Sequence, residues 1–252
     1  MKKIGGILTV VAALMFFGIN NARAYSVTII SDPINNVFNW SGSPDNFDRI
    51  GDPMFEISKM VVTQDASLLT FDIYTNLSQS LQYVGAWPIF PADLAIDVPG
   101  GADYEYGIAF TNNFGYTPGS LYEVSHWMTS NYYDPTSYDR SWQPGSYAPY
   151  AYHDGQIVTI ANATVVDAGS VSWLPGADGS QYIIRTSLDI NNIVDPGFDG
   201  NIGLFYGGAT CANDYINGSV KVSNPVPEPA TMSLLGLGLI GLLGKRFRNR
   251  KS

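Results

Sequence analysis

Short runs that alternate between apolar and polar residues recur along the middle of this chain. In the clearest one, Leu69, Phe71 and Ile73 are separated by Thr70 and Asp72, which is the pattern of a strand with one buried and one exposed face. No long stretch between the two chain ends has a helical period of 3.6 residues. Ten segments are predicted as strands: Ser26–Ile30, Glu56–Thr63, Leu68–Asn76, Ala92–Val98, Tyr104–Phe110, Gly119–Val124, Ile157–Ala161, Gln181–Asp189, Ile202–Tyr206 and Ser219–Val222.

Turn signals separate the predicted strands. The dipeptide Asp-Gly begins at Asp154, Asp178 and Asp199, and this pair favours tight turns between strands. About ten short strands over roughly 200 residues are typical of two packed antiparallel sheets. The sequence therefore predicts an all-β fold, an antiparallel β-sandwich that is jelly-roll-like and extends over residues 25–222.

The composition favours an extracellular domain and argues against nucleic acid as a partner. The chain is 45% hydrophobic and only 14% charged, with 26 Gly and 15 Pro, which suits an exported β-rich protein. Residues 25–224 contain five basic and 21 acidic residues, a net charge of about −16. Such a surface repels phosphate backbones, whose binding needs Lys and Arg. Divalent cations and neutral glycans remain compatible with it.

A single cysteine, Cys211, limits how the domain is held together. One thiol cannot form an internal disulfide, so the apolar core must stabilise the fold alone. We expect Cys211 to be a small buried apolar residue, because a nucleophilic cysteine would need a base that the local sequence does not offer.

The first 24 residues have the form of a signal peptide. A basic start is followed by the apolar run Ile4–Ile19 and then by Ala22 and Ala24, which form an Ala-x-Ala cleavage site. The apolar run is shorter than the ~20 residues of a membrane-spanning helix, which argues against an uncleaved anchor. We therefore predict that signal peptidase cleaves after Ala24 and that the mature chain begins at Tyr25.

The C-terminus has three parts in a fixed order, and the first of them belongs to a linker that covers residues 223–229. The prolines of the first part keep the backbone extended and accessible to an enzyme. The second part, residues 230–244, is uncharged; as a helix it spans ~22 Å, and basic residues that snorkel from its end let it serve as a transmembrane helix. The third part, residues 245–252, is basic and favours the cytoplasmic side. The first part consists of Val226, Pro227, Glu228 and Pro229.

This arrangement resembles the PEP-CTERM sorting signal of exported proteins in Gram-negative bacteria. The resemblance covers about residues 226–251. It implies that an integral-membrane exosortase recognises the chain and cuts near the Pro-Glu-Pro element. The alternative is a plain C-terminal membrane anchor.

An acidic, glycine-rich turn between two predicted strands is a candidate cation site. Asp97, Asp103 and Glu105 could supply oxygen ligands to Ca²⁺, which accepts six to eight oxygens in flexible geometry. The EF-hand spacing is absent, and Val98-Pro99 stands where a further ligand would be expected. The alternative is a hairpin whose acidic residues face water.

Aromatic residues are concentrated between Phe114 and Tyr152. Exposed Tyr and Trp side chains on loops can stack against sugar rings, so this segment is a candidate site for a polysaccharide. The alternative is that these rings pack on one another at an open end of the fold. The candidate ligand-binding residues are Trp127, Trp142, Tyr132 and Tyr133.

Signals for catalysis are weak. His126 and His153 are the only histidines and have no metal-ligand spacing around them. No G-x-S-x-G elbow occurs, and nothing selects a carboxylate pair for glycoside hydrolysis. We therefore expect that the protein is not an enzyme and name no catalytic residue.

The sequence as a whole predicts an exported protein with a structural or adhesive domain. Its precursor would be anchored in the inner membrane, and the processed form would belong to the cell surface or extracellular matrix. The expected partners are signal peptidase, exosortase and, before processing, the membrane. A carbohydrate-binding module that uses residues 114–152 and a secreted hydrolase are the alternatives.

Overall fold

The computed structural model of this protein describes most of the region between the two terminal signals. The described residues are 25–32, 37–38, 49–50, 53–80, 82–84, 87–101, 104–129, 157–208 and 214–224. The predicted signal peptide, Pro-Glu-Pro element, apolar segment and basic tail lie outside them. Within the described part, no helix is long and apolar enough to cross a membrane. Residues 24–224 form one compact unit.

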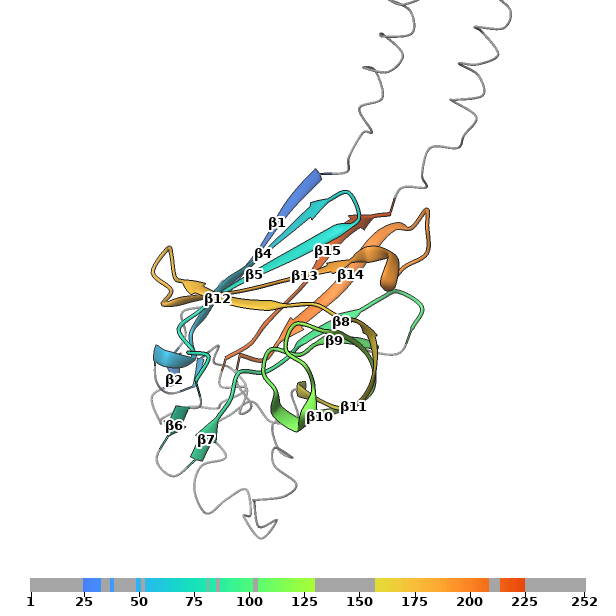
Figure 1. The fold of residues 1–252 in the computed structure, drawn as a ribbon. Helices are drawn as coiled ribbons and strands as arrows, with labels where there is room; N and C mark the ends of the chain where they lie inside the picture. Colours follow the sequence, from blue (N-terminus) through green and yellow to red (C-terminus); the bar gives the residue numbers. More distant parts are fainter. Residues whose placement is uncertain are drawn as a thin grey trace, which may run out of the picture. The chain divides into compact units, whose positions relative to one another are not determined.

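Two antiparallel sheets make up most of the described structure (Figure 1). The five-stranded sheet has the order β1 (Tyr25–Ser31), β4 (Ile57–Asp65), β5 (Leu68–Thr75), β13 (Tyr182–Asp189) and β12 (Val171–Pro175). The six-stranded sheet has the order β11 (Ile157–Asp167), β10 (Leu121–Thr129), β9 (Tyr106–Ile108), β8 (Leu94–Asp97), β14 (Asp199–Tyr206) and β15 (Ile216–Ser223). The all-β, antiparallel prediction is confirmed.

Shorter elements complete the described part of the chain. The parallel pair β2 and β3 and the antiparallel pair β6 and β7 each form a two-stranded sheet. Their bounds are Val37–Phe38, Arg49–Ile50, Gln82–Val84 and Trp87–Ile89. The helical elements in the described ranges are the 3-10 turns η2 (Pro53–Phe55), η3 (Asn113–Gly115) and η4 (Ile190–Asn192).

A single apolar core joins the inner faces of the two large sheets. It follows from the alternation along the strands: in β5, Leu69, Phe71 and Ile73 are fully buried, whereas Thr70 and Asp72 on the opposite face are half-buried. Neighbouring strands contribute in the same way. The core residues of these strands include Ile57, Met60, Val62, Leu94, Ile96, Ile184, Leu188, Ile202, Leu204, Val220 and Val222.

The buried side chain of Gln64 links the two sheets at one edge. Its amide nitrogen donates to the backbone oxygens of Ser223 and Ala66, and its oxygen accepts from the Ser223 N–H at 3.2 Å. Gln64 is also the strand partner of Ser26. The beginning of β1 and the end of β15 therefore lie at the same end of the domain.

The hairpin of β10 and β11 curls strongly, as Figure 1 shows. The pairing of these strands shifts register between Leu121 and Tyr122, on both sides of His126, and between Met128 and Thr129. Each such irregularity increases local twist and bends the strand. This hairpin therefore curls, whereas β14 and β15 pair over eight residues without a register shift.

The structure corrects several details of the sequence prediction. The prediction missed the short strands β2, β3, β6 and β7. It also missed β12, which follows Gly-Ser and ends in the first residue of Pro-Gly and therefore resembles a loop. The predicted tight turn at Asp199-Gly200 is wrong, because both residues belong to β14 and pair with Ser223 and Val222. The turn occurs earlier, where the Phe198 N–H donates to the Asp195 oxygen and Gly197 has φ 90°, as a Pro-Gly type II turn requires.

Stability should depend on the shared core rather than on the outer faces. We expect Phe71→Ala to lower the free energy of unfolding by about 3–5 kcal/mol, because it removes a buried ring and leaves a cavity. Thr63→Ala, on the outer face of the neighbouring strand, should change it by no more than about 0.5 kcal/mol. Urea denaturation of both variants measures the difference. Equal losses would contradict a core located between the sheets.

Candidate functional site

A buried carboxylate, Asp93, lies where β8 begins. Its Oδ1 accepts from the Phe110 N–H at 2.9 Å, and its Oδ2 accepts from the Ile160 N–H at 3.0 Å and the Thr159 hydroxyl at 2.6 Å. Its own N–H donates to the Val158 oxygen at 2.8 Å. Asp93 therefore joins the start of β8 to the segment after β9 and to β11.

Burial dominates the electrostatics of this group. Desolvation raises the pKa of Asp93 to about 6, although its three hydrogen-bond donors favour the charged form and act against the rise. The same burial raises the pKa of the Tyr206 phenol, and the charges of Asp93 and Asp214 add to this effect. The Tyr206 hydroxyl donates to the Gly208 oxygen at 2.7 Å. Both groups are thus held by the backbone in the interior.

A shifted pKa often marks a catalytic group, but the position of Asp93 argues for a structural role. A general acid or base must reach the proton of a substrate, whereas Asp93 is buried and its oxygens are occupied by Phe110, Thr159 and Ile160. Sequence reasoning missed this residue because an aspartate near the start of a predicted strand ordinarily faces water.

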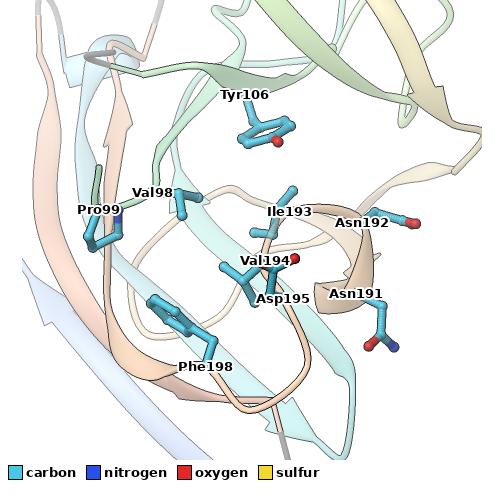
Figure 2. A pocket seen from close by; sticks show the side chains of 9 residues that line it. All are labelled: Val98, Pro99, Tyr106, Asn191, Asn192, Ile193, Val194, Asp195 and Phe198. Carbon is cyan, nitrogen blue, oxygen red and sulfur yellow. The ribbon is translucent and has the colours of Figure 1, made fainter. Parts of the chain in front are cut away.

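A hollow of about 320 Å³ opens beside the acidic turn and η4 (Figure 2). It is lined by Val98, Pro99, Tyr106, Asn191, Asn192, Ile193, Val194, Asp195 and Phe198. The Tyr106 and Phe198 rings and several aliphatic side chains contribute to its lining, but the surface that solvent can reach is mainly polar, and the polar side chains in the lining are Asn191, Asn192 and Asp195. Burial raises the pKa of the Tyr106 phenol, and the charges of Glu123 and Glu105 raise it further. Its hydroxyl therefore stays protonated and can donate a hydrogen bond.

Most amide groups around the hollow are used to build it. Asp189 caps η4 by accepting from the Asn191 N–H at 3.0 Å and from its side-chain amide at 2.7 Å. The Asn192 amide donates to Asp167 Oδ2 at 2.8 Å and so joins η4 to the end of β11. These bonds fix the shape of the hollow without contributing to recognition.

Asn224 attaches the end of the domain to the loop that carries the hollow. It is buried, and its side-chain amide donates to Asn191 Oδ1 and to the backbone oxygens of Val194 and Asp195 at 3.2–3.3 Å. Its backbone pairs with Phe198 at 2.7 Å. The folded domain therefore extends to residue 224, two residues beyond the predicted boundary.

The structure places two of the three predicted calcium ligands. Glu105 lies over Gly101, and its Oε2 accepts from the Val98 N–H at 3.1 Å, so it closes the turn between β8 and β9. Asp97 lies against its strand partner Gly203. Asp103 lies outside the described residues, and those that are described contain no cluster of three His, Cys, Asp or Glu side chains. The calcium site stays a prediction.

Trp127 is half-buried in a packed aromatic region. Its ring lies against Gly107, where an added Cβ would be 2.6 Å from the ring, and against Ile160. Its indole N–H donates to the Tyr104 oxygen at 2.7 Å. These are packing contacts within the domain, and ligand binding by Trp127 stays a prediction. The other candidates Tyr132, Tyr133 and Trp142 lie outside the described residues, as do His153 and Cys211, while His126 is exposed on β10.

Comparison with known proteins gives one match, at the C-terminus. Residues 225–251 match the family model described as PEP-CTERM protein-sorting motif. The chain thus carries the predicted sorting motif, which supports an exported protein that an exosortase processes. No curated protein and no solved structure matches the chain.

Asp93 should make stability depend on pH. The pKa of Asp93 is higher in the folded state than the ordinary value of 3.8, so the folded state favours the protonated carboxyl. The stabilisation that protonated Asp93 contributes is therefore fully present below about pH 4 and is lost as the pH rises through about 6. Asp93→Asn does not titrate. Relative to this variant, the wild type should gain up to about 3 kcal/mol on acidification from pH 7 to pH 4, as measured by urea denaturation. A difference that stays constant with pH would contradict the shift.

Proposed function

We propose that this protein is an exported component of the cell envelope or extracellular matrix, with a β-sandwich domain that has a structural or adhesive role. Signal peptidase would release the N-terminus at Tyr25. An exosortase would recognise Val226–Pro229 and process the C-terminus of a precursor anchored in the inner membrane. The proposal contains no catalytic step by this chain.

The observation that carries the proposal is the position of the sorting motif relative to the folded domain. The match to the motif begins at residue 225, and the preceding Asn224 is buried. The sorting motif thus begins directly after the last described residue of the domain in the sequence, and the two do not overlap. This favours a domain that is delivered intact and a tail that serves sorting alone.

The polar interior supports a structural role for the domain. The described buried polar side chains largely bond to backbone groups: Asp93 to Phe110 and Ile160, Gln64 to Ser223, and Asn224 to Val194. Hydrogen bonds of this kind fix a unique packing.

Sorting can be tested on the C-terminus of the mature protein. In a host with a working exosortase, mass spectrometry should show that the last residues are missing from the wild-type product. Replacing Pro227, Glu228 and Pro229 together with Ala should leave the tail attached, because the stiff recognition element is lost. Thr231→Ala, just beyond the motif, is the matched control and should be processed. A wild-type product with an intact tail in that host would refute the proposal.

A second candidate function is binding of a neutral polysaccharide, which the hollow supports. Carbohydrate sites combine aromatic rings with polar groups, and the mainly polar hollow includes the rings of Tyr106 and Phe198 and the exposed Asp195. Carboxylates accept hydrogen bonds from sugar hydroxyls. The acidic domain repels anionic polymers and therefore favours neutral ones.

Titration with neutral oligosaccharides tests this second function. If a glycan occupies the hollow, Asp195→Asn should weaken its binding about tenfold, since a hydrogen bond to a charged group contributes about 1.5–3 kcal/mol. Asp199→Asn is the control, because Asp199 pairs with Lys221 at 3.3 Å and does not line the hollow. Binding that both substitutions weaken equally, or that neither affects, would place the glycan elsewhere.

A further inference from the structure

β1 is an outer strand, and one of its edges is unpaired among the residues that the structure describes. It pairs with β4 over its full length, from Tyr25 opposite Asp65 to Ser31 opposite Lys59, and it ends the five-stranded sheet. Its outward side chains are unusually apolar for a surface: Tyr25 is 70%, Val27 50% and Ile29 58% exposed. A regular strand with these properties is a template for pairing with another strand.

The other outer strands of the two large sheets carry features that discourage such pairing. β12 ends in Pro175, β11 is interrupted by register shifts, and β15 contains Lys221. Proline, bulges and lysine are the usual means of protecting an edge. β1 contains no proline, no charged residue and no register shift. Among these four edges, β1 alone is suited to strand addition.

A hydrogen bond just beyond the end of β1 shows which of its residues direct their N–H and C=O groups toward β4 and which direct them toward the open edge. The Asp32 N–H donates to the Ser58 oxygen at 3.3 Å. Hydrogen-bonded pairs alternate along an antiparallel ladder, so the even-numbered residues of β1 bond to β4. The odd-numbered residues, Tyr25 to Ser31, therefore direct their N–H and C=O groups to the open edge.

We propose that β1 pairs with β1 of a second copy of this chain, antiparallel and centred on Thr28. This register places Val27 opposite Ile29 of the second copy and Tyr25 opposite Ser31. All of these residues are odd-numbered, so the N–H and C=O groups at the open edges of the two copies can form hydrogen bonds with each other. Their exposed side chains then lie side by side on the outer face of the sheet. The sequence of β1 is thus complementary to itself, and two five-stranded sheets become one continuous sheet.

Local charge at the edge does not oppose a second copy as the occupant. β1 is neutral within an acidic domain, so the contact itself brings no like charges into opposition. Cleavage after Ala24, as predicted, would leave an α-ammonium group on Tyr25, next to Asp32 of the second copy. The two copies should still repel each other at long range, so that added salt strengthens the pairing.

Cysteine crosslinking tests the register directly. In a Cys211→Ser background, Thr28→Cys places two thiols in a non-hydrogen-bonded pair with Cα atoms about 4.5 Å apart, within the range that a disulfide spans. Ser26→Cys lies on the same face of β1, but its counterpart in the second copy would be about 14 Å away along the strand, four residues at ~3.4 Å per residue. Mild oxidation of the protein as its host produces it should therefore give a covalent dimer with Thr28→Cys alone.

A pair of valine substitutions tests the surface without crosslinking. Val27→Lys adds a charge to the centre of the proposed contact, whereas Val165→Lys adds the same charge to β11 at a similar exposure of 60%. Sedimentation should show a dimer that Val27→Lys abolishes and Val165→Lys preserves. Circular dichroism checks that both variants are folded.

Three results would overturn the proposal. The first is a protein that stays monomeric at every accessible concentration and whose Thr28→Cys variant forms no crosslinked dimer. The second is a dimer that persists in Val27→Lys, and the third is a Thr28→Cys variant that crosslinks to a different protein. None of them would affect the exosortase hypothesis, because the pairing depends on β1 and the sorting depends on the C-terminal motif.

Discussion

The apolar core shared by the two sheets is the constraint on which the rest of this domain depends. Cys211 is the only cysteine, so no internal disulfide supports the fold. The inner faces of strands such as β5 and β14 must therefore pack against each other to stabilise either sheet. The hydrogen bonds of Gln64 and Asp93 are buried in or beside this core, where an unpaired polar group would be costly. The same core that gives stability thus makes the hydrogen bonds of Gln64 and Asp93 necessary.

The sequence predicted this core because alternation is a local property. Leu69, Phe71 and Ile73 are recognisable in any strand with one buried face, and the prediction of an all-β antiparallel fold was confirmed. The tight turn at Asp178-Gly179 was also predicted correctly, since both residues have positive φ. Asp199-Gly200 has the same letters but lies in β14, because Pro196-Gly197 already reverses the chain. Where two turn-forming dipeptides lie close together in the sequence, local sequence alone does not show which of them forms the turn.

The candidate site was much harder to predict, because long-range contacts create it. The hollow combines two parts of the chain, the turn after β8 and the segment from η4 to Phe198, just before β14. About 90 residues of sequence separate these two parts. Asp93 is likewise defined by partners on β11, more than 60 positions away. No local pattern distinguishes these residues from ordinary surface positions. By contrast, the sorting motif is contiguous, and its recognition from sequence was confirmed by the match to residues 225–251.

The geometry of the domain ends connects the fold to export. Gln64 pairs with Ser26 and bonds to Ser223, so the first and last strands begin and end at the same end of the domain. Both segments that export enzymes are proposed to cut are attached there. Only two residues separate Asn224 from Pro227, so the Cα atoms of these two residues are at most ~11 Å apart when the chain is extended. An exosortase that grips the Pro-Glu-Pro element must therefore work close to the folded surface, and the buried Asn224 keeps that surface from unravelling into the tail.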